Sequence, residues 1–371
     1  TLSVTPDANS TKAITVDIAA GKFTDALGNN NVATVQQVQE VNTVAPSITI
    51  TDDKTAVTNS AILYTFTLSA ASTNFSIDDI TVTGGTKAAT LTAVSPTVYT
   101  LSVTPDVNSI TPVTVDVAAG KFNDAAGNGN LIATQNSQAV DTVLPTISIQ
   151  DNQAGVLRSG DVIYNFTLSE PSSNFSIDDI TVTGGTKAAT LTAVSPTVYT
   201  LSVTPTANSD TPLTVDIAAG KFSDAVGNGN VAATQSVQEV NTKPINGTAI
   251  DGYLTGSDVF ADANGDGIWN TGEAKATTDA NGKFTLPSGS AGALIVSGGT
   301  DKATGQAFKG VLKAPEGATA ITPLTTVQQG FIESGQTPAQ AQASVAKAFG
   351  FSNTINLATY DPIAALTNAS A

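Results

Sequence analysis

Residues 74–105, NFSIDDITVTGGTKAATLTAVSPTVYTLSVTP, recur without a single change at residues 174–205. The segment that follows them also recurs, because TLSVTP and a later AAGKF-x-DA-x-GN stand in register at Thr1, Thr100 and Thr200. The repeat is therefore 99 and then 100 residues long. A fixed period of about one small domain indicates a tandem array in which each unit folds by itself.

Short runs of alternating apolar and polar residues fill each repeat. Turn signals separate them, among them the Gly-Gly pair at 84–85 and the Gly-Asn-Gly-Asn run at 127–130. Period-two alternation rich in Val, Ile and Thr predicts half-buried strands, here at residues 47–51, 62–68, 80–83, 99–103 and 113–117. About seven short strands per repeat predict an antiparallel β-sandwich of immunoglobulin-like architecture.

The composition excludes several classes of function. The chain has no Cys, Met or His, so the common nucleophilic triads and transition-metal sites cannot form from its residues. Its 31 acidic and 15 basic residues give a net charge of −16, which disfavours nucleic acid and suits hard cations such as calcium. No apolar run reaches the roughly 18 residues of a membrane helix.

Short linkers that end in proline divide the chain. They lie at residues 41–46, 140–145 and 240–244, and proline stiffens a connection because it holds φ near −65°. We therefore expect half of an Ig-like repeat at 1–45, complete repeats at 46–144 and 145–244, a calcium-binding β-sandwich at 245–320, and a helical hairpin at 321–371. The array is expected to be rod-like.

Four motifs carry a resemblance to a known family: FSIDDITVTGG, SPTVYTLSVTP, VDVAAGKFNDAAGNGN and the linker DTVLP. The repeats resemble the bacterial immunoglobulin-like domains of giant repetitive surface proteins and secreted adhesins. This resemblance covers residues 1–243 and implies an extracellular or cell-surface location. It identifies no particular ligand.

Residues 262–273, DANGDGIWNTGE, satisfy the twelve-residue calcium-loop pattern D-x-N-x-D-G-x5-E at every position. In this pattern alternate side chains converge on one ion and the last carboxylate binds it through both oxygens, while the glycine at position six permits the sharp turn. The predicted ligands are Asp262, Asn264, Asp266, the Ile268 carbonyl, Asn270 and Glu273. The alternative interpretation is a solvated turn rich in Asp and Gly.

The surroundings of this loop are strand-like on both sides. The stretch VFADANGDGIWNTGEA, with the later TTDANGKFTL, resembles the calcium-binding B repeats of Gram-positive surface proteins, which are related to collagen-adhesin stalk domains. That resemblance implies that calcium rigidifies the domain. The only Trp, Trp269, is interpreted as a packing residue more readily than as a platform for a sugar.

Two helices are predicted after residue 321. Thr322 and Thr337 each stand before a proline, as N-cap residues do, and Gln340 completes a capping box with Thr337. Gly350 is a candidate C-cap. The expected apolar faces are Val327 with Phe331, and Ala341 with Val345 and Phe349. The segment resembles, more loosely, a helical module that follows such domains in large bacterial exoproteins.

A repeated Asp-x-x-Gly-Asn loop, beginning at Asp25, Asp124 and Asp224, is a second calcium candidate. It could also be a plain turn, because Asp, Gly and Asn favour Asx-turns. Both interpretations stay open. Lys87 and Lys187 are expected to be solvated.

The expected function is structural. Near-identical repeats argue against an active site in each unit, so we expect no enzyme but a calcium-stiffened rod serving as stalk, fibre or surface-layer component. The alternatives are an adhesin that binds a host or matrix glycan or protein through its C-terminal module, and the accessory region of a secreted enzyme.

Residues 1–45 match only the second half of a repeat, Thr100 to Leu144. Either upstream residues complete this half, or a neighbouring chain supplies the missing strands. The second option would give self-association into a fibre or sheet.

Overall fold

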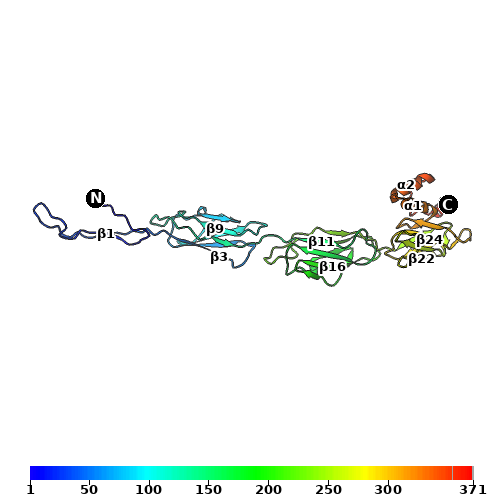
Figure 1. Ribbon diagram of the computed structural model, residues 1–371, viewed down its shortest axis with the longest axis horizontal. Helices are drawn as coiled ribbons and strands as arrows, with labels where there is room; N and C mark the ends of the chain where they lie inside the picture. The colour runs from blue at the N-terminus through cyan, green and yellow to red at the C-terminus, as the bar shows by residue number, and fades with distance from the viewer. Residues whose placement is uncertain (353, 370–371) are drawn as a thin grey trace. The chain divides into compact units, whose positions relative to one another are not determined.

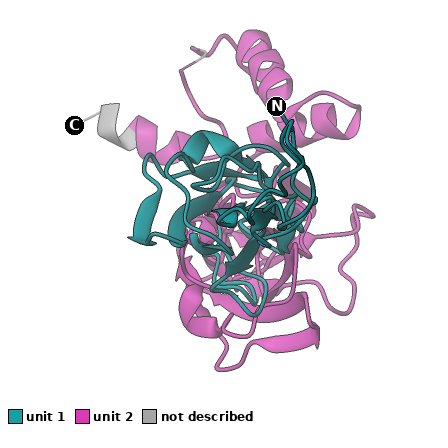
Figure 2. Ribbon diagram, turned by 90° about the vertical axis from the view of Figure 1, so that its left-hand side faces the viewer, with its two compact units in different colours: residues 1–145, 223–230 teal, residues 146–222, 231–371 magenta. Residues whose placement is uncertain are grey.

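The computed structural model describes residues 1–352 and 354–369 (Figure 1). It divides into two compact units (Figure 2). Unit 1 consists of residues 1–145 and 223–230, and unit 2 of residues 146–222 and 231–371.

In unit 1, residues 46–144 form two facing antiparallel sheets. One sheet has the strand order β3-β4-β8-β6, with β7 also paired to β8, and the other has the order β10-β9-β5. The strands are β3 (Ile48–Asp52), β4 (Ile62–Leu68), β5 (Ile80–Thr83), β6 (Gly85–Lys87), β7 (Thr92–Ser95), β8 (Val98–Pro105), β9 (Val113–Val117) and β10 (Asn136–Gln138). The predicted sandwich is confirmed, with strand bounds that differ by at most two residues from the predicted runs.

The apolar residues that recur at every second position of the sequence are the residues that are buried in the structure. Along β4 the side chains of Ile62, Tyr64, Phe66 and Leu68 are buried while those between them are more accessible. Each inward side chain removes apolar surface from water, which is the main driving force for closing the two sheets.

The Gly-Gly turn between β5 and β6 has a steric reason. Gly84 has a positive φ of 72°, and a Cβ there would collide with the backbone of Pro112.

In unit 2, residues 146–222 and 231–240 repeat this architecture. The sheet orders are β11-β12-β16-β14, with β15 beside β16, and β13-β17-β18. The strands are β11 (Ile147–Asp151), β12 (Val162–Leu168), β13 (Thr181–Thr183), β14 (Gly185–Lys187), β15 (Thr192–Ser195), β16 (Val198–Pro205), β17 (Leu213–Asp216) and β18 (Ser236–Gln238). The buried residues of the two sandwiches form separate cores.

The prediction that Lys87 and Lys187 are solvated was wrong. The Lys87 ammonium donates hydrogen bonds to the carbonyl oxygens of Ile77 and Ile80, at 3.0 and 2.8 Å. Lys187 does the same with Ile177 and Ile180. These carbonyls belong to or directly follow the short 3-10 helices Ile77–Asp79 and Ile177–Asp179, and the Ile77 and Ile177 carbonyls also accept from the N–H groups of Ile80 and Ile180.

Residues 1–45 form a two-stranded ribbon of β1 (Ile14–Val16) and β2 (Gln37–Gln39). Phe23 is 60% exposed, whereas its counterpart in the next repeat, Phe122, is fully buried at 0%. Val16 is likewise exposed, and its counterpart Val115 is buried. The ribbon therefore presents the same apolar side chains that form the core of residues 46–144.

The C-terminal part of unit 2 is a third β-domain with its own core. Its sheets have the orders β23-β19-β27, β20-β25 and β22-β21-β24-β26. The strands are β19 (Ile245–Ala249), β20 (Leu254–Thr255), β21 (Asp258–Asp262), β22 (Lys275–Thr277), β23 (Lys283–Leu286), β24 (Ala293–Ser297), β25 (Thr300–Asp301), β26 (Val311–Ala314) and β27 (Ala320–Ile321).

Three helices follow: α1 (Pro323–Glu333), α2 (Pro338–Phe349) and α3 (Pro362–Ala369). The caps are as predicted, with Thr322 and Thr337 accepting hydrogen bonds from the third residue of each helix and Gly350 in the left-handed conformation. The third helix was not predicted, and it makes the module more than a hairpin. Among the described residues, no helix has the length and apolar character needed to cross a bilayer.

The predicted apolar faces of these helices were partly wrong. Val327 is 41% exposed, and α1 instead buries Thr325, Gln328 and Gln329 against the domain. The Thr325 hydroxyl donates to the Lys313 carbonyl oxygen on β26, at 2.8 Å. In α2, Ala341 and Val345 are buried as expected, but Phe349 is exposed.

Candidate metal centre

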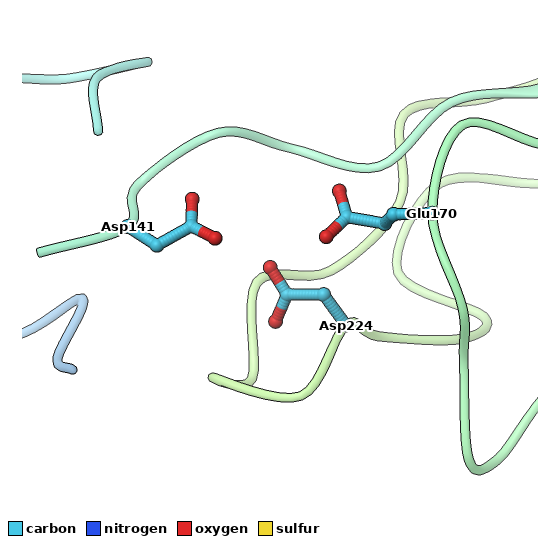
Figure 3. A group of neighbouring side chains, drawn as sticks. All are labelled: Asp141, Glu170 and Asp224. Atoms are coloured by element: carbon cyan, nitrogen blue, oxygen red, sulfur yellow. The ribbon is translucent and has the colours of Figure 1, made fainter. Parts of the chain in front are cut away.

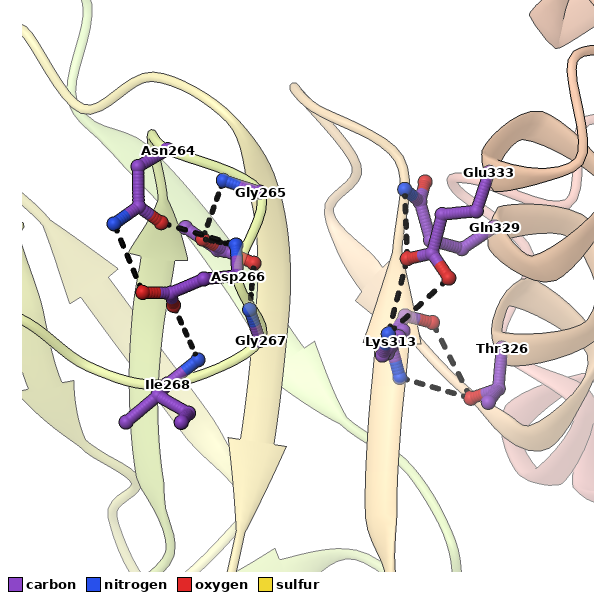
Figure 4. Close-up of polar contacts among 10 residues, drawn as sticks. Asn264, Gly265, Asp266, Gly267, Ile268, Lys313, Thr326, Gln329 and Glu333 are labelled. Atoms are coloured by element: carbon purple, nitrogen blue, oxygen red, sulfur yellow. Dashed lines mark hydrogen bonds and ion pairs between the residues drawn. The ribbon is translucent and has the colours of Figure 1, made fainter.

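The predicted calcium loop connects the last residue of β21 to the start of β22 (Figure 4). Asp262, the first predicted ligand, ends β21 and is only 5% exposed. β21 is a central strand, paired with both β22 and β24. The sheet therefore holds the first predicted ligand in place. The other residues of the loop lie between the end of β21 and the start of β22.

Backbone N–H groups of the loop hold the Asp262 carboxylate. Its Oδ1 accepts from Gly265 at 2.8 Å and from Asp266 at 3.2 Å, and its Oδ2 accepts from Gly267 at 2.8 Å. Gly267, at position six, has a φ of +78°, which a residue with a side chain rarely adopts. The chain thus wraps around the first carboxylate.

Asp266 lies at the centre of the loop's side-chain contacts (Figure 4). Its Oδ2 accepts hydrogen bonds from the Nδ2 atoms of Asn264 and Asn270, at 3.0 and 2.8 Å. Its Oδ1 accepts from the Ile268 N–H at 2.8 Å. The hydrogen bond from Ile268 and those from the two amides lower the pKa of Asp266, so the carboxylate is held in its charged form.

Glu273 closes the loop from its far end. Its Oε1 accepts from the Ala263 N–H and its Oε2 from the Asn270 N–H, both at 2.9 Å. One carboxylate therefore ties the second and ninth positions of the loop together, and both of its oxygens face the loop backbone.

The donor set fits a calcium ion by its chemistry. The six predicted ligands offer carboxylate, amide and carbonyl oxygens, which are the ligands that calcium prefers. The two Asn side chains now present Nδ2 to Asp266, and turning either amide about its last side-chain bond would present Oδ1 instead. Turning both amides would place their two Oδ1 atoms beside Asp266 Oδ2, and a cation stabilises such a group of three oxygens.

Trp269 links the loop to the neighbouring strand. Its Nε1 donates to the Glu273 carbonyl oxygen at 3.2 Å, and the Lys275 ammonium lies 5.1 Å from the ring centroid. The side chain is still 43% exposed. Trp269 therefore makes packing contacts without being a core residue, and its environment depends on the conformation of the loop.

The repeated Asp-x-x-Gly-Asn loops form Asx-turns in all three copies. In each copy the Asp Oδ1 accepts from the N–H groups two and four residues later, and Oδ2 accepts from the Asn side chain. The three loops therefore have the hydrogen bonds of Asx-turns. A cation at these loops remains a prediction.

One difference distinguishes two of these loops, both of which belong to unit 1. The Asn42 amide donates to Asp124 at 3.2 Å. Asp141 occupies the position equivalent to Asn42 in the next linker, and its carboxylate lies within 4.8 Å of the Asp224 carboxylate (Figure 3). Figure 3 also labels Glu170, which belongs to unit 2. Asn42 is thus a hydrogen-bond donor to Asp124, whereas Asp141 brings a second negative charge close to Asp224.

These turns predict a loss of stability in acid. The Asn128 side chain and the loop N–H groups lower the pKa of Asp124. Because the pKa is lower in the folded state, the stabilisation is complete above the unfolded value of about 3.9 and is lost as the pH falls through the folded value. Asp124→Asn should therefore be less stable than the unmodified chain at pH 6, and the difference should shrink towards pH 2.

Urea unfolding midpoints measured across this pH range test the prediction. Asp78→Asn, which removes an exposed carboxylate from the same repeat, is the matched control. A difference between Asp124→Asn and the unmodified chain that does not change with pH would contradict the prediction.

Comparison with known proteins agrees with the sandwich architecture. A model of the bacterial Ig-like domain matches residues 42–140 and again residues 141–240. A search of curated proteins found no match.

Several solved structures are similar at low sequence identity. The T6 backbone pilin of serotype M6 Streptococcus pyogenes is 10% identical over 73% of this chain and 80% of that chain, with a TM-score of 0.28. The tetra-tandem repeat in the extending region of a large adhesion protein is 16% identical over 82% and 81%, with a TM-score of 0.23. The I9–I11 tandem from titin is 10% identical over 74% and 98%, with a TM-score of 0.27.

Likenesses at these TM-scores carry no argument about function. The two matches to the family model, by contrast, cover more than half of the sequence and coincide with the two complete sandwiches. The chain belongs to the bacterial Ig-like domain family.

Proposed function

We propose that this chain is part of an extracellular bacterial surface protein whose work is mechanical. In this proposal the Ig-like repeats form a shaft, and a calcium ion bound at residues 262–273 stiffens the domain that follows them. The protein would serve as a stalk, a fibre or a component of a surface layer, with no catalysis.

The observation that carries the proposal is the repetition of one core. Phe66, Phe75, Tyr99 and Phe122 form an aromatic layer in the first complete repeat. The second complete repeat has the same four residue types in the same layer, at Phe166, Phe175, Tyr199 and Phe222. A chain that repeats its interior in this way supplies length and surface.

Calcium has a supporting argument of its own. Asp262, Asp266 and Glu273 place three carboxylates in one twelve-residue loop. A cation would offset their mutual repulsion and would also fix the loop against β21 and β22. Binding to the folded state alone stabilises that state by mass action.

Small-angle X-ray scattering of the chain tests the mechanical role. A compact globule of 371 residues would have a radius of gyration of about 21 Å. We expect a clearly larger value, because sandwiches joined by linkers that end in proline should extend. A value near that of the globule, with or without calcium, would contradict the shaft.

Electron microscopy of the native surface material, with and without a calcium chelator, addresses assembly. Filaments or sheets would support self-association. Isolated particles under both conditions would oppose it.

A further inference from the structure

The C-terminal β-domain carries a polar cleft that neither the Ig-like repeats nor the calcium loop explains. A cleft of about 410 Å³ runs along the sheet β23-β19-β27. A second cleft of about 270 Å³ shares Thr248, Lys283 and Asp361 with the first, so the two are contiguous. The larger cleft alone is within the size range of ligand sites, about 300–1,000 Å³.

The segment before α3 builds the opposite wall and is anchored to the sheet. The N–H groups of Thr319 and Ala320 both donate to the Ala358 carbonyl oxygen, at 2.8 and 2.9 Å. Thr359 and Asp361, which follow directly, line the cleft. The wall is therefore held by backbone hydrogen bonds and does not depend on a ligand.

A strained tyrosine, Tyr253, lines the smaller cleft. Tyr253 has a φ of +62°, and the other non-glycine residues with positive φ among the described ones are all asparagines. A bulky residue in this region is a true outlier, and such strain concentrates at binding and catalytic sites. Its hydroxyl donates to Asp361 Oδ2 at 3.0 Å. This hydrogen bond holds the half-buried side chain in the smaller cleft.

Two lysines, Lys283 and Lys302, line the smaller cleft, and both interact electrostatically with the Asp279 carboxylate. Lys302 donates to Asn281 Oδ1 at 2.9 Å, and Lys283 has no ion-pair partner within 4.0 Å among the described residues. Asp361 lines both clefts and adds a negative charge, and its oxygens are held by hydrogen bonds within the chain. Its Oδ1 accepts from the N–H groups of Ile363 and Ala364 at the start of α3, each at 2.9 Å.

The other polar side chains of the larger cleft are alcohols and amides, and they lie beside the apolar residues Ile250, Phe284 and Ala320. Asn246, Thr248, Thr285, Thr319 and Thr359 line the larger cleft. Such groups pair with the hydroxyls of a sugar, an ammonium pairs with a carboxylate, and a tyrosine ring can face the C–H side of a pyranose.

We propose that this cleft binds an acidic saccharide, a sugar chain whose rings carry carboxylates. Lys283 and Lys302 take the carboxylates, Thr248 and Asn281 bond the ring hydroxyls, and Tyr253 supports one ring. The site shares no residue with the loop at 262–273, so saccharide binding is independent of calcium.

Calorimetric titration of the 371-residue chain with trigalacturonate at low salt tests the proposal. Binding is expected, and the methyl ester of the same trisaccharide, which has the rings without the charges, should bind at least tenfold more weakly. Lys283→Gln with Lys302→Gln should also weaken trigalacturonate binding at least tenfold. Lys309→Gln, an exposed lysine of the same domain outside the cleft, should leave it unchanged.

Three results would overturn the proposal. They are no binding of trigalacturonate to the unmodified chain, equal binding of its methyl ester, and binding that survives the double lysine substitution. Triglutamate that binds as tightly as trigalacturonate would assign the cleft to an acidic peptide instead. Binding that persists in a chelator would show that the saccharide site stands apart from the calcium loop.

Discussion

Removing calcium with a chelator should lower the unfolding temperature of the C-terminal β-domain by about 10 °C or more. An ion that binds only the folded state adds about 2.7 kcal/mol of stability at one hundred times its Kd. For a domain of this size each kcal/mol corresponds to roughly 4–8 °C. Asp262→Ala with Glu273→Ala should abolish the response, because these residues are the first and last predicted ligands.

Trp269 makes the measurement specific to one domain. It is the only Trp in the chain, it lies inside the loop, and its ring is next to Lys275 on β22. Its fluorescence should change on titration with calcium and should report the unfolding of this domain alone. Terbium, which replaces calcium at oxygen sites, should be sensitised by the same ring.

A milder substitution covers the case in which the double alanine variant does not fold. Asp262 holds three backbone N–H groups, so its removal also disturbs the loop without metal. Glu273→Gln keeps the shape and one acceptor oxygen but removes a charge, and it should weaken calcium binding in a folded domain. Asp251→Asn, an exposed acid of the same domain, is the control. If the chelator does not change the melting curve of the unmodified chain, the calcium site at residues 262–273 is excluded.

The strands of the repeats were predictable because one physical signal dominates them. In β4 and β9 every second residue is apolar, and burial follows that period without exception. The turns followed from glycine, as at Gly84, where both the backbone conformation and the space exclude a side chain. Here local pattern and tertiary packing demand the same residues.

The helical module was harder because its buried face is polar. Thr325 and Gln328 face inward on α1, and hydrophobic periodicity pointed instead to Val327 and Phe331. The reason is visible in the contacts of Thr325, which bonds the Lys313 carbonyl oxygen on β26. A partner that lies 12 residues away in sequence leaves no periodic signal. The Lys87 bonds to Ile77 and Ile80 escaped prediction for the same reason.

The calcium loop and the cleft also differ in how far they could be predicted from the sequence. The calcium loop is a continuous segment with fixed spacing, so its residues could be named from the sequence. The cleft collects Thr248, Lys283, Lys302 and Asp361 from segments that are far apart along the chain. Only the φ of Tyr253 marks it, and no sequence pattern predicts a left-handed tyrosine.

Phe75→Ala should destabilise the first complete repeat by about 3–5 kcal/mol, the usual loss when a buried aromatic ring is replaced by a methyl group. The Phe75 ring is 8% exposed and lies at the centre of a layer, 5.9 Å from Phe66 and 5.1 Å from both Tyr99 and Phe122 between ring centroids. Its removal leaves a cavity between the sheets that three rigid rings cannot fill. A loss of this size is a large part of the stability of a single domain.

The second repeat is a built-in control for this substitution. Phe175 holds the same place among Phe166, Tyr199 and Phe222, with centroid distances of 6.1, 5.0 and 5.2 Å. Because the two cores are separate, Phe75→Ala should loosen only the first repeat and Phe175→Ala only the second. Leu63→Ala, an exposed position on β4, should cost under about 0.5 kcal/mol.

Hydrogen exchange read by mass spectrometry can separate the repeats, provided that the right peptides are used. Peptides from residues 74–105 and 174–205 have the same sequence and therefore the same mass. Residues 106–144 and 206–244 differ in sequence and contain the strands β9 and β17, so they report each repeat by itself. Faster exchange in residues 106–144 alone is the expected result for Phe75→Ala. Equal acceleration in both segments would show that the repeats unfold together, and the separate cores would then not be independent units of stability.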